Sequence, residues 1–136
     1  MDTALQIISQ KLEDYISATE LVHTHEPLWL QYFTKRLTVK DGNILRMIPL
    51  SSILYLQSKS NYTLIVTGNK QFLICKTLKH FESSLVHPYF SRVHNSFIIN
   101  KMYVDSISKS DQKIKMKNGA LIPISKSFKY LNQILL

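Results

Sequence analysis

The residues best suited to molecular recognition lie in segment 90–100, which reads FSRVHNSFIIN. Its predicted core residues are Phe90, Val93, Phe97 and Ile99, and its polar residues, predicted to lie outside the core, are Arg92, His94, Asn95, Ser96 and Asn100. Asparagine can form two hydrogen bonds with adenine, and serine and histidine can donate to phosphate or base acceptors. The segment therefore carries the chemistry needed to face a groove of nucleic acid.

The same segment also has a purely structural interpretation. In that interpretation, Asn95 and Ser96 form a turn by satisfying their own backbone, and His94 is a buried, paired imidazole. On the residues alone, the structural interpretation is the stronger one for His94. Both interpretations remain open for Asn95.

Two further polar loops have a similar composition. Residues 57–62 separate two apolar stretches, and residues 125–129 follow the last apolar stretch of this kind. Both can present lysine and amide groups beyond the end of a sheet, where binding loops commonly lie. Their alternatives are a solvated hairpin tip and a helix cap, respectively.

Catalytic, metal and cofactor sites are not indicated. The four acidic residues after position 30 are scattered, so no carboxylate pair is available for acid–base chemistry. His23 and His25 lack the partners of a zinc site, and three glycines are too few for a phosphate-binding loop. The single Cys75 lies in an apolar stretch and is predicted to be an inert core thiol. We therefore expect no enzyme, no cofactor and no small-molecule substrate.

The charge is unevenly distributed along the chain. Residues 1–30 hold one basic and five acidic residues, whereas residues 31–136 hold 16 basic and four acidic ones, a net charge of +12. Such a basic domain suits a polyanion, and neutralising DNA phosphates releases condensed counterions. An anionic membrane surface is the rival partner, and charge that only keeps the domain soluble is the structural alternative. Because the chain has no long apolar segment, no signal peptide and a single cysteine, we expect a soluble protein in the reducing cytoplasm.

The two charge regions coincide with two structural regions. Apolar residues at spacings of three and four predict an amphipathic helix over residues 3–21. Pro27 then breaks the pattern, because a proline disfavours helix in the residue before it. This places an N-terminal helix and linker at 1–30 and a second domain at 31–136.

From Phe33 onward, short β-branched and aromatic stretches predict a mainly β domain. The predicted strands are 34–39, 44–49, 53–58, 62–67, 71–76, 91–94, 96–99, 104–108, 113–116 and 121–124. Asp41-Gly42, Gly68-Asn69 and Asn118-Gly119 are expected to supply the positive φ of tight hairpins. Short helices are predicted over 77–85 and 128–135.

These stretches resemble a known family. The resemblance is carried by 48–56, Asn61-Tyr62, Thr77-Leu78 with Phe81 and Leu85, the block 90–100, Asn118-Gly119 and 122–125. Together they are similar to the LytTR-type DNA-binding domain found at the C-terminus of bacterial response regulators in two-component systems. The resemblance covers residues 37–135, roughly three quarters of the chain.

The resemblance implies elongated, small antiparallel sheets whose loops enter the grooves of double-stranded DNA. It implies base contacts from Asn61, Tyr62, Asn95 and Lys126, and backbone contacts from Lys59, Ser60, Arg92, His94, Ser96 and Lys129. Some members have histidine and arginine where this chain has Asn61 and Lys126. The preferred bases therefore do not transfer, because lysine lacks the two-point fork of arginine.

The segment before the basic domain departs from that family. Most members have a phosphoacceptor receiver domain there, whereas this chain has some 30 residues, so no receiver is expected. The helix in this segment is interpreted as an interdomain linker, a dimerisation element or a protein contact. The expected function is a transcription regulator that binds promoter repeats as two copies. The alternative is a non-catalytic interaction module whose basic face binds an acidic partner.

Overall fold

The computed structural model describes residues 3–19, 26–85 and 89–125. The helical elements are α1 (Thr3–Thr19), α2 (Leu28–Thr34) and α3 (Leu78–Glu82), with short 3-10 turns at Leu50–Ser52 and Lys101–Tyr103. The strands are β1 (Arg36–Asp41), β2 (Ile44–Pro49), β3 (Ile53–Lys59), β4 (Tyr62–Thr67), β5 (Gln71–Ile74), β6 (Phe90–His94), β7 (Phe97–Asn100), β8 (Val104–Ser108), β9 (Lys113–Met116) and β10 (Leu121–Pro123). This confirms the predicted mainly β fold of about ten short strands in small antiparallel sheets.

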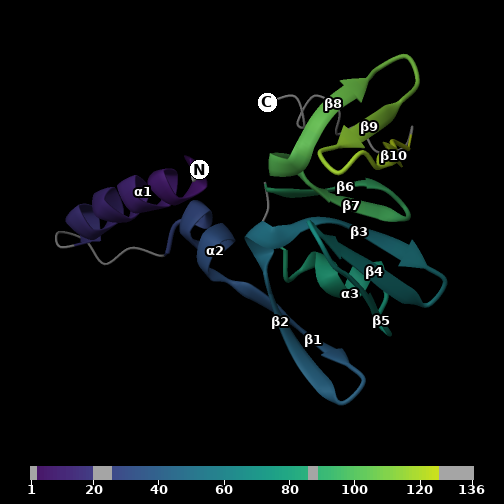
Figure 1. Ribbon diagram of the computed structural model, residues 1–136, viewed down its shortest axis with the longest axis horizontal. Helices are drawn as coiled ribbons and strands as arrows, with labels where there is room; N and C mark the ends of the chain where they lie inside the picture. The colour runs from purple at the N-terminus through teal and green to yellow at the C-terminus, as the bar shows by residue number, and fades with distance from the viewer. Residues whose placement is uncertain (1–2, 20–25, 86–88, 126–136) are drawn as a thin grey trace.

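The strands form three sheets that follow one another along the molecule (Figure 1). The central sheet has the order β5-β4-β3-β7-β6, and every pairing in it is antiparallel. The ribbon β1-β2 lies on one side of it, and the sheet β10-β9-β8 lies on the other. In this order, β3 and β7 are neighbouring inner strands. The loops at their ends therefore come from the first and the second half of the chain.

Each face of the central sheet covers a separate hydrophobic cluster. Leu56, Ile65 and Ile98 pack with α2, α3 and the β1-β2 ribbon, whereas Val66 and Ile99 pack with β6, β9 and β10. Because both faces are covered, the inner strands are almost continuously apolar instead of alternating. Complete burial of side chains such as Ile98 and Ile99 contributes roughly 1.5–3 kcal/mol each.

Helix α2 was missed by the sequence prediction, which expected a strand from residue 34. It begins after Pro27, whose carbonyl oxygen accepts hydrogen bonds from the amides of Leu30 and Gln31, both at 3.1 Å. Seven residues are too few for a helical period to stand out, and this short segment is rich in aromatic residues. The domain boundary at residue 30, which remains a prediction, falls inside this helix.

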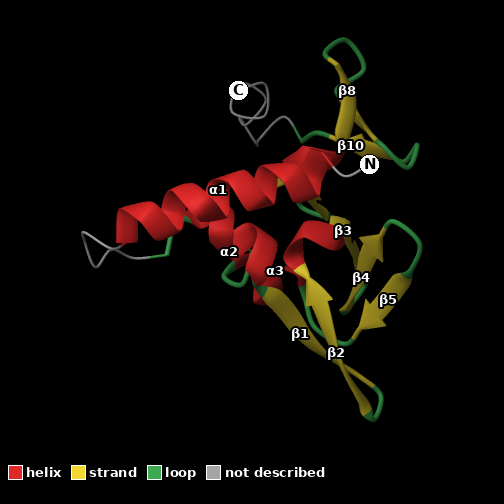
Figure 2. Ribbon diagram, turned by 60° about the vertical axis from the view of Figure 1, so that its left-hand side comes forward, coloured by secondary structure: helices red, strands yellow, loops and turns green. Residues whose placement is uncertain are grey.

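Helix α1 lies beside α2 on the N-terminal side of the molecule (Figure 2). The ammonium group of Lys11 sits 5.6 Å from the centre of the Trp29 ring, a cation–π contact between the two helices. Leu5 and Ile7 are exposed on α1. The amphipathic helix predicted over 3–21 is thus confirmed through Thr19, and residues 20 and 21 lie outside the described residues.

Two local predictions need correction. Gly42 and Gly119 have the expected positive φ, at 63° and 89°, but Gly68 lies outside the left-handed region. Cys75 is exposed instead of packed in the core. Its strand β5 ends at Ile74, which is buried, so Cys75 lies beyond the strand and does not share the buried position of Ile74. The predicted C-terminal helix 128–135 lies outside the described residues.

Candidate nucleic-acid interface

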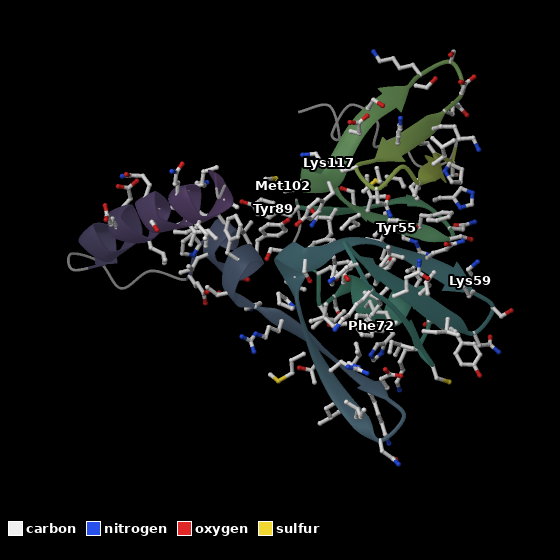
Figure 3. The ribbon with its side chains drawn as sticks, viewed as in Figure 1. Tyr55, Lys59, Phe72, Tyr89, Met102 and Lys117 are labelled. Carbon is white, nitrogen blue, oxygen red and sulfur yellow. The ribbon has the colours of Figure 1, made fainter. Side chains whose placement is uncertain are left out.

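Three polar segments meet at one end of the central sheet. The backbone amide of Ser58 donates to the carbonyl oxygen of Ser96 at 2.8 Å, which joins the β3-β4 hairpin to the β6-β7 turn. The amide of Ser125 donates to the carbonyl oxygen of Val93 at 2.9 Å, which joins the segment after β10 to β6. We call the residues at this end the loop edge: Lys59, Ser60, Asn61, Tyr62, His94, Asn95, Ser96 and Ser125. In Figure 3, Lys59 marks this edge, and Tyr89 and Met102 mark the opposite end.

The β3-β4 hairpin carries the first exposed group of side chains. Lys59 pairs with Tyr62 across a tight turn, and Ser60 has a φ of 56°. A left-handed conformation is uncommon for a residue with a side chain, and such conformations concentrate at functional sites. Lys59, Ser60 and Asn61 are exposed, and Tyr62 retains 43% exposure. The hairpin thus presents a cation, an amide and a phenol beyond the end of the sheet.

The β6-β7 turn is built around the guanidinium group of Arg92. Its Nε donates to the carbonyl oxygen of His94 at 3.2 Å, and a terminal nitrogen donates to the carbonyl oxygen of Asn95 at 2.6 Å. The other terminal nitrogen pairs with the carboxylate of Glu82 in α3. The ladder between β6 and β7 is irregular between Arg92 and His94, with Val93 fully buried beneath it. The arginine therefore connects the turn to the helix behind it.

His94 and Ser96 close the turn from inside. The backbone amide of Ser96 donates to Nδ1 of His94 at 3.0 Å, which leaves the ring proton on Nε2. The ring packs edge-on against Phe97, with the ring centres 5.9 Å apart. His94 is paired, as its structural interpretation required, but it is half-buried instead of buried. Asn95 is exposed, and its side-chain amide has no hydrogen bond within the described part of the chain.

Asn100 is buried, contrary to the prediction that it lies outside the core. Its Nδ2 donates to the Tyr32 hydroxyl and to the carbonyl oxygen of Ile53, both at 2.8 Å, and its Oδ1 accepts from the amide of Met102 at 3.1 Å. Burial raises the pKa of Tyr32 to about 12, although the hydrogen bond from Asn100 acts in the opposite direction. Asn100 is the last residue of β7 and lies at the end of the strand opposite the β6-β7 turn, so it is remote from the loop edge. Its hydrogen bond to Tyr32 holds α2 on the sheet.

The third segment of the loop edge is described as far as Ser125. Lys126 and Lys129, the predicted base and backbone contacts in this segment, lie outside the described residues. The structure adds an exposed cation that the sequence prediction did not include, Lys113 on β9. Lys113 pairs with Pro123, and the neighbouring carbonyl oxygen of Gln112 accepts from the amide of Ile124 at 3.0 Å. The alternation of lysine with buried Ile114 and Met116 was the available sequence signal.

Two of the four acidic side chains of the basic domain are paired with arginines, and the other two, Asp105 and Asp111, are exposed. Asp41 pairs with Arg46 at 3.1 Å in the β1-β2 ribbon, and Glu82 pairs with Arg92. Within 3–19, 26–85 and 89–125, no group of three or more His, Cys, Asp or Glu residues could hold a metal ion. Over the same residues, no helix is long and apolar enough to cross a bilayer.

The chain is thus a mainly β domain of small antiparallel sheets with a net positive charge, and its polar loops gather at one end of the central sheet. Residues 43–135 match the sequence model of the LytTr DNA-binding domain, and the chain belongs to this family. The solved LytTr DNA-binding domain of a methyl-accepting/DNA response regulator from Bacillus cereus superposes with a TM-score of 0.65 at 26% identity, covering 75% of this chain and 97% of that one.

Regulatory proteins of three bacteria show the same likeness. The sensory transduction protein LytT of Bacillus subtilis (strain 168) is 27% identical over 96 residues, or 68% of this chain. The sensory transduction protein LytR of Streptococcus agalactiae is 28% identical over 101 residues, and the transcriptional regulatory protein LytR of Staphylococcus aureus (strain N315) is 24% identical over 99 residues. In all three, the match covers 40% of the relative's own length, so the chain corresponds to one part of those proteins.

Proposed function

We propose that this chain is the DNA-binding part of a transcription regulator and that its loop edge recognises promoter DNA. The observation that carries the proposal is the pair of backbone hydrogen bonds, Ser58 to Ser96 and Ser125 to Val93, which bring three polar segments to one end of the sheet. Separate loops at one edge can enter neighbouring parts of a groove together. The family and the net charge of +12 over residues 31–136 support DNA as the partner.

The base contacts in this proposal come from Asn61, Tyr62, Asn95 and Lys126. Asn95 is the strongest of these because its amide is exposed and has no intramolecular hydrogen bond within the described residues. An asparagine amide matches the acceptor and donor of adenine in the major groove, and a good two-point contact contributes about 1–3 kcal/mol of discrimination. The exposed amide of Asn61 offers the same chemistry on the adjacent hairpin.

Phosphate contacts in this proposal come from exposed lysines and from neutral donors of the turn. Lys59, Lys113 and Lys129 supply the charge, and Ser60 and Ser96 supply hydroxyl groups. His94 contributes Nε2–H, since its Nδ1 is occupied by the amide of Ser96. These contacts fix the register of the domain on the duplex without reading its sequence.

The decisive experiment selects bound sites from a random duplex pool and then titrates the selected site with salt. We expect an enriched motif, and the logarithm of affinity should fall linearly with the logarithm of salt concentration. An absence of duplex binding at low salt, or an affinity that does not change with salt, would contradict the proposal and favour an acidic protein partner. Two enriched half-sites, with sedimentation of a complex that contains two chains, would support binding as a pair.

A further inference from the structure

We propose that Arg92, held by Glu82, is a positioning residue that fixes the β6-β7 turn so that Asn95 faces the bases, and that it does not bind phosphate. The inference rests on the proposed function and concerns how the same edge acquires specificity. It changes the role of Arg92, for which the family resemblance implied a contact with the DNA backbone.

The hydrogen bonds of the guanidinium group are already directed into the protein. Nε and one terminal nitrogen bind the consecutive carbonyl oxygens of His94 and Asn95, at 3.2 Å and 2.6 Å. The other terminal nitrogen binds Glu82. A phosphate contact in the two-point geometry that arginine favours would require breaking part of this arrangement. Fixing the carbonyl group of Asn95, in contrast, fixes the direction in which its side chain leaves the backbone.

Glu82 provides the fixed end of this arrangement. It is the last residue of α3, a helix anchored in the core by Leu78 and Phe81, which are 3% and 2% exposed. The Arg92 side chain is half-buried, at 26% exposure, whereas that of Glu82 is exposed, at 42%. The carboxylate also neutralises the guanidinium charge, which reduces the attraction of Arg92 for phosphate. The core thus positions Glu82, Glu82 positions Arg92, and Arg92 positions the turn.

The two roles of Arg92 predict opposite behaviour for conservative variants. Arg92→Lys retains the charge, so a phosphate contact would largely survive, but a lysine cannot bind two carbonyl groups and a carboxylate in one plane. Glu82→Gln removes a negative charge, so simple electrostatics would strengthen binding to every duplex. If Arg92 acts by positioning, both variants weaken binding to the selected site alone.

The test measures the affinity of the full chain for its selected site and for a scrambled duplex, by fluorescence anisotropy over a salt series. Matched controls are Asp105→Asn, which removes an exposed acid on β8, and Lys59→Gln, which removes an exposed cation at the loop edge. Thermal unfolding confirms that each variant is folded. Hydrogen exchange of the Ser96 amide in the free protein reports the order of the turn, because this amide bonds to His94 within it.

We expect Arg92→Lys and Glu82→Gln to lower affinity for the selected site about five- to tenfold, which is part of the discrimination that one two-point base contact provides. For Arg92→Lys, the affinity for the scrambled duplex and the salt slope should match those of the parent. For Glu82→Gln, the affinity for the scrambled duplex should rise no more than it does in Asp105→Asn. Exchange at Ser96 should accelerate in both variants. An Arg92→Gln variant tests the phosphate role directly. If it loses affinity equally for both duplexes and has a smaller salt slope, the inference is overturned. Stronger binding of Glu82→Gln to both duplexes, in parallel with Asp105→Asn, would also overturn it. A parent chain without sequence preference would instead overturn the proposed function, and this outcome is distinguished because the parent is measured in every series.

Discussion

Asn100 and Tyr32 are joined by a hydrogen bond of 2.8 Å, although 68 residues separate them in the chain. The same side-chain nitrogen also binds the carbonyl oxygen of Ile53, and the side-chain oxygen accepts from Met102. One fully buried amide therefore connects α2, the start of β3 and the turn after β7. Tyr89 stacks on the Tyr32 ring, with the ring centres 4.4 Å apart, and completes this junction.

We expect Asn100→Ala to lower the free energy of unfolding by about 2–4 kcal/mol. The substitution leaves the Ile53 carbonyl group and the Met102 amide without their partner, and an unsatisfied buried polar group costs about 1–3 kcal/mol. Urea denaturation measures the change. The matched control is Asn69→Ala at the exposed β4-β5 turn, which should stay within about 0.5 kcal/mol of the parent. Similar effects of the two variants would contradict the assigned role of Asn100.

Alkaline pH should destabilise the fold through Tyr32. Its pKa is about 12 in the folded protein against an ordinary value of 10.0, so the unfolded chain ionises first. The contribution of Tyr32 to stability is therefore complete below pH 10 and is lost progressively as pH rises toward 12. Denaturant unfolding at several pH values measures this decline. Tyr32→Phe should make it less steep, and an identical decline in the variant would refute the prediction. Tyr89 and Tyr103, whose pKa values burial also raises, are retained in both proteins.

Asn95→Ala should weaken binding to the selected site by about 1–3 kcal/mol and leave binding to a scrambled duplex nearly unchanged. The fold should be unaffected, because the side chain is exposed and only its carbonyl oxygen is bonded to Arg92. Competition binding with both duplexes measures the difference. Asn69→Ala again serves as the control, since Asn69 lies at the opposite end of the central sheet. Equal losses on the two duplexes would show that Asn95 does not read bases.

Lys113→Gln should lower affinity for all duplexes alike and reduce the salt slope by about one. This is the behaviour of a lysine that binds phosphate and reads no base. Lys70→Gln is the matched control, because Lys70 is exposed but lies at the β4-β5 turn, away from the loop edge. Binding curves over a salt series measure both variants. A smaller salt slope for Lys70→Gln than for Lys113→Gln would contradict the prediction, because it would show that DNA phosphates bind near the β4-β5 turn and not near Lys113.

Strand positions could be predicted closely because local chemistry sets them. The bounds of β2, β4, β8 and β9 are those expected, since β-branched stretches there end at turn residues such as Gly42 and Gly119. Burial was predicted less well. Asn100 was predicted to lie outside the core and Cys75 inside it, in both cases from residue type and local sequence. Tertiary packing reverses both predictions, since Asn100 is buried against Tyr32 and Cys75 is exposed beyond the end of β5.

In the candidate site, too, local sequence predicts some features and tertiary packing determines the others. Asn61, Asn95 and Lys126 could be proposed because polar residues interrupt apolar stretches and match a family pattern. The hydrogen bond from Ser58 to Ser96 could not be predicted, because it depends on β3 and β7 being neighbours. For the same reason, the bonds of Arg92 to Glu82 and to the turn were not visible in the sequence, and arginine was assigned by its charge alone.

Strand β7 is short, and its two ends meet different parts of the molecule. At a rise of about 3.3 Å per residue, its first and last residues are about 10 Å apart. One end continues into the turn that carries Asn95, and the other holds α2 through Tyr32. Between these ends, Ile98 packs into one hydrophobic cluster and Ile99 into the other, so α2 cannot shift the turn through β7 without disturbing the packing on both faces of the central sheet.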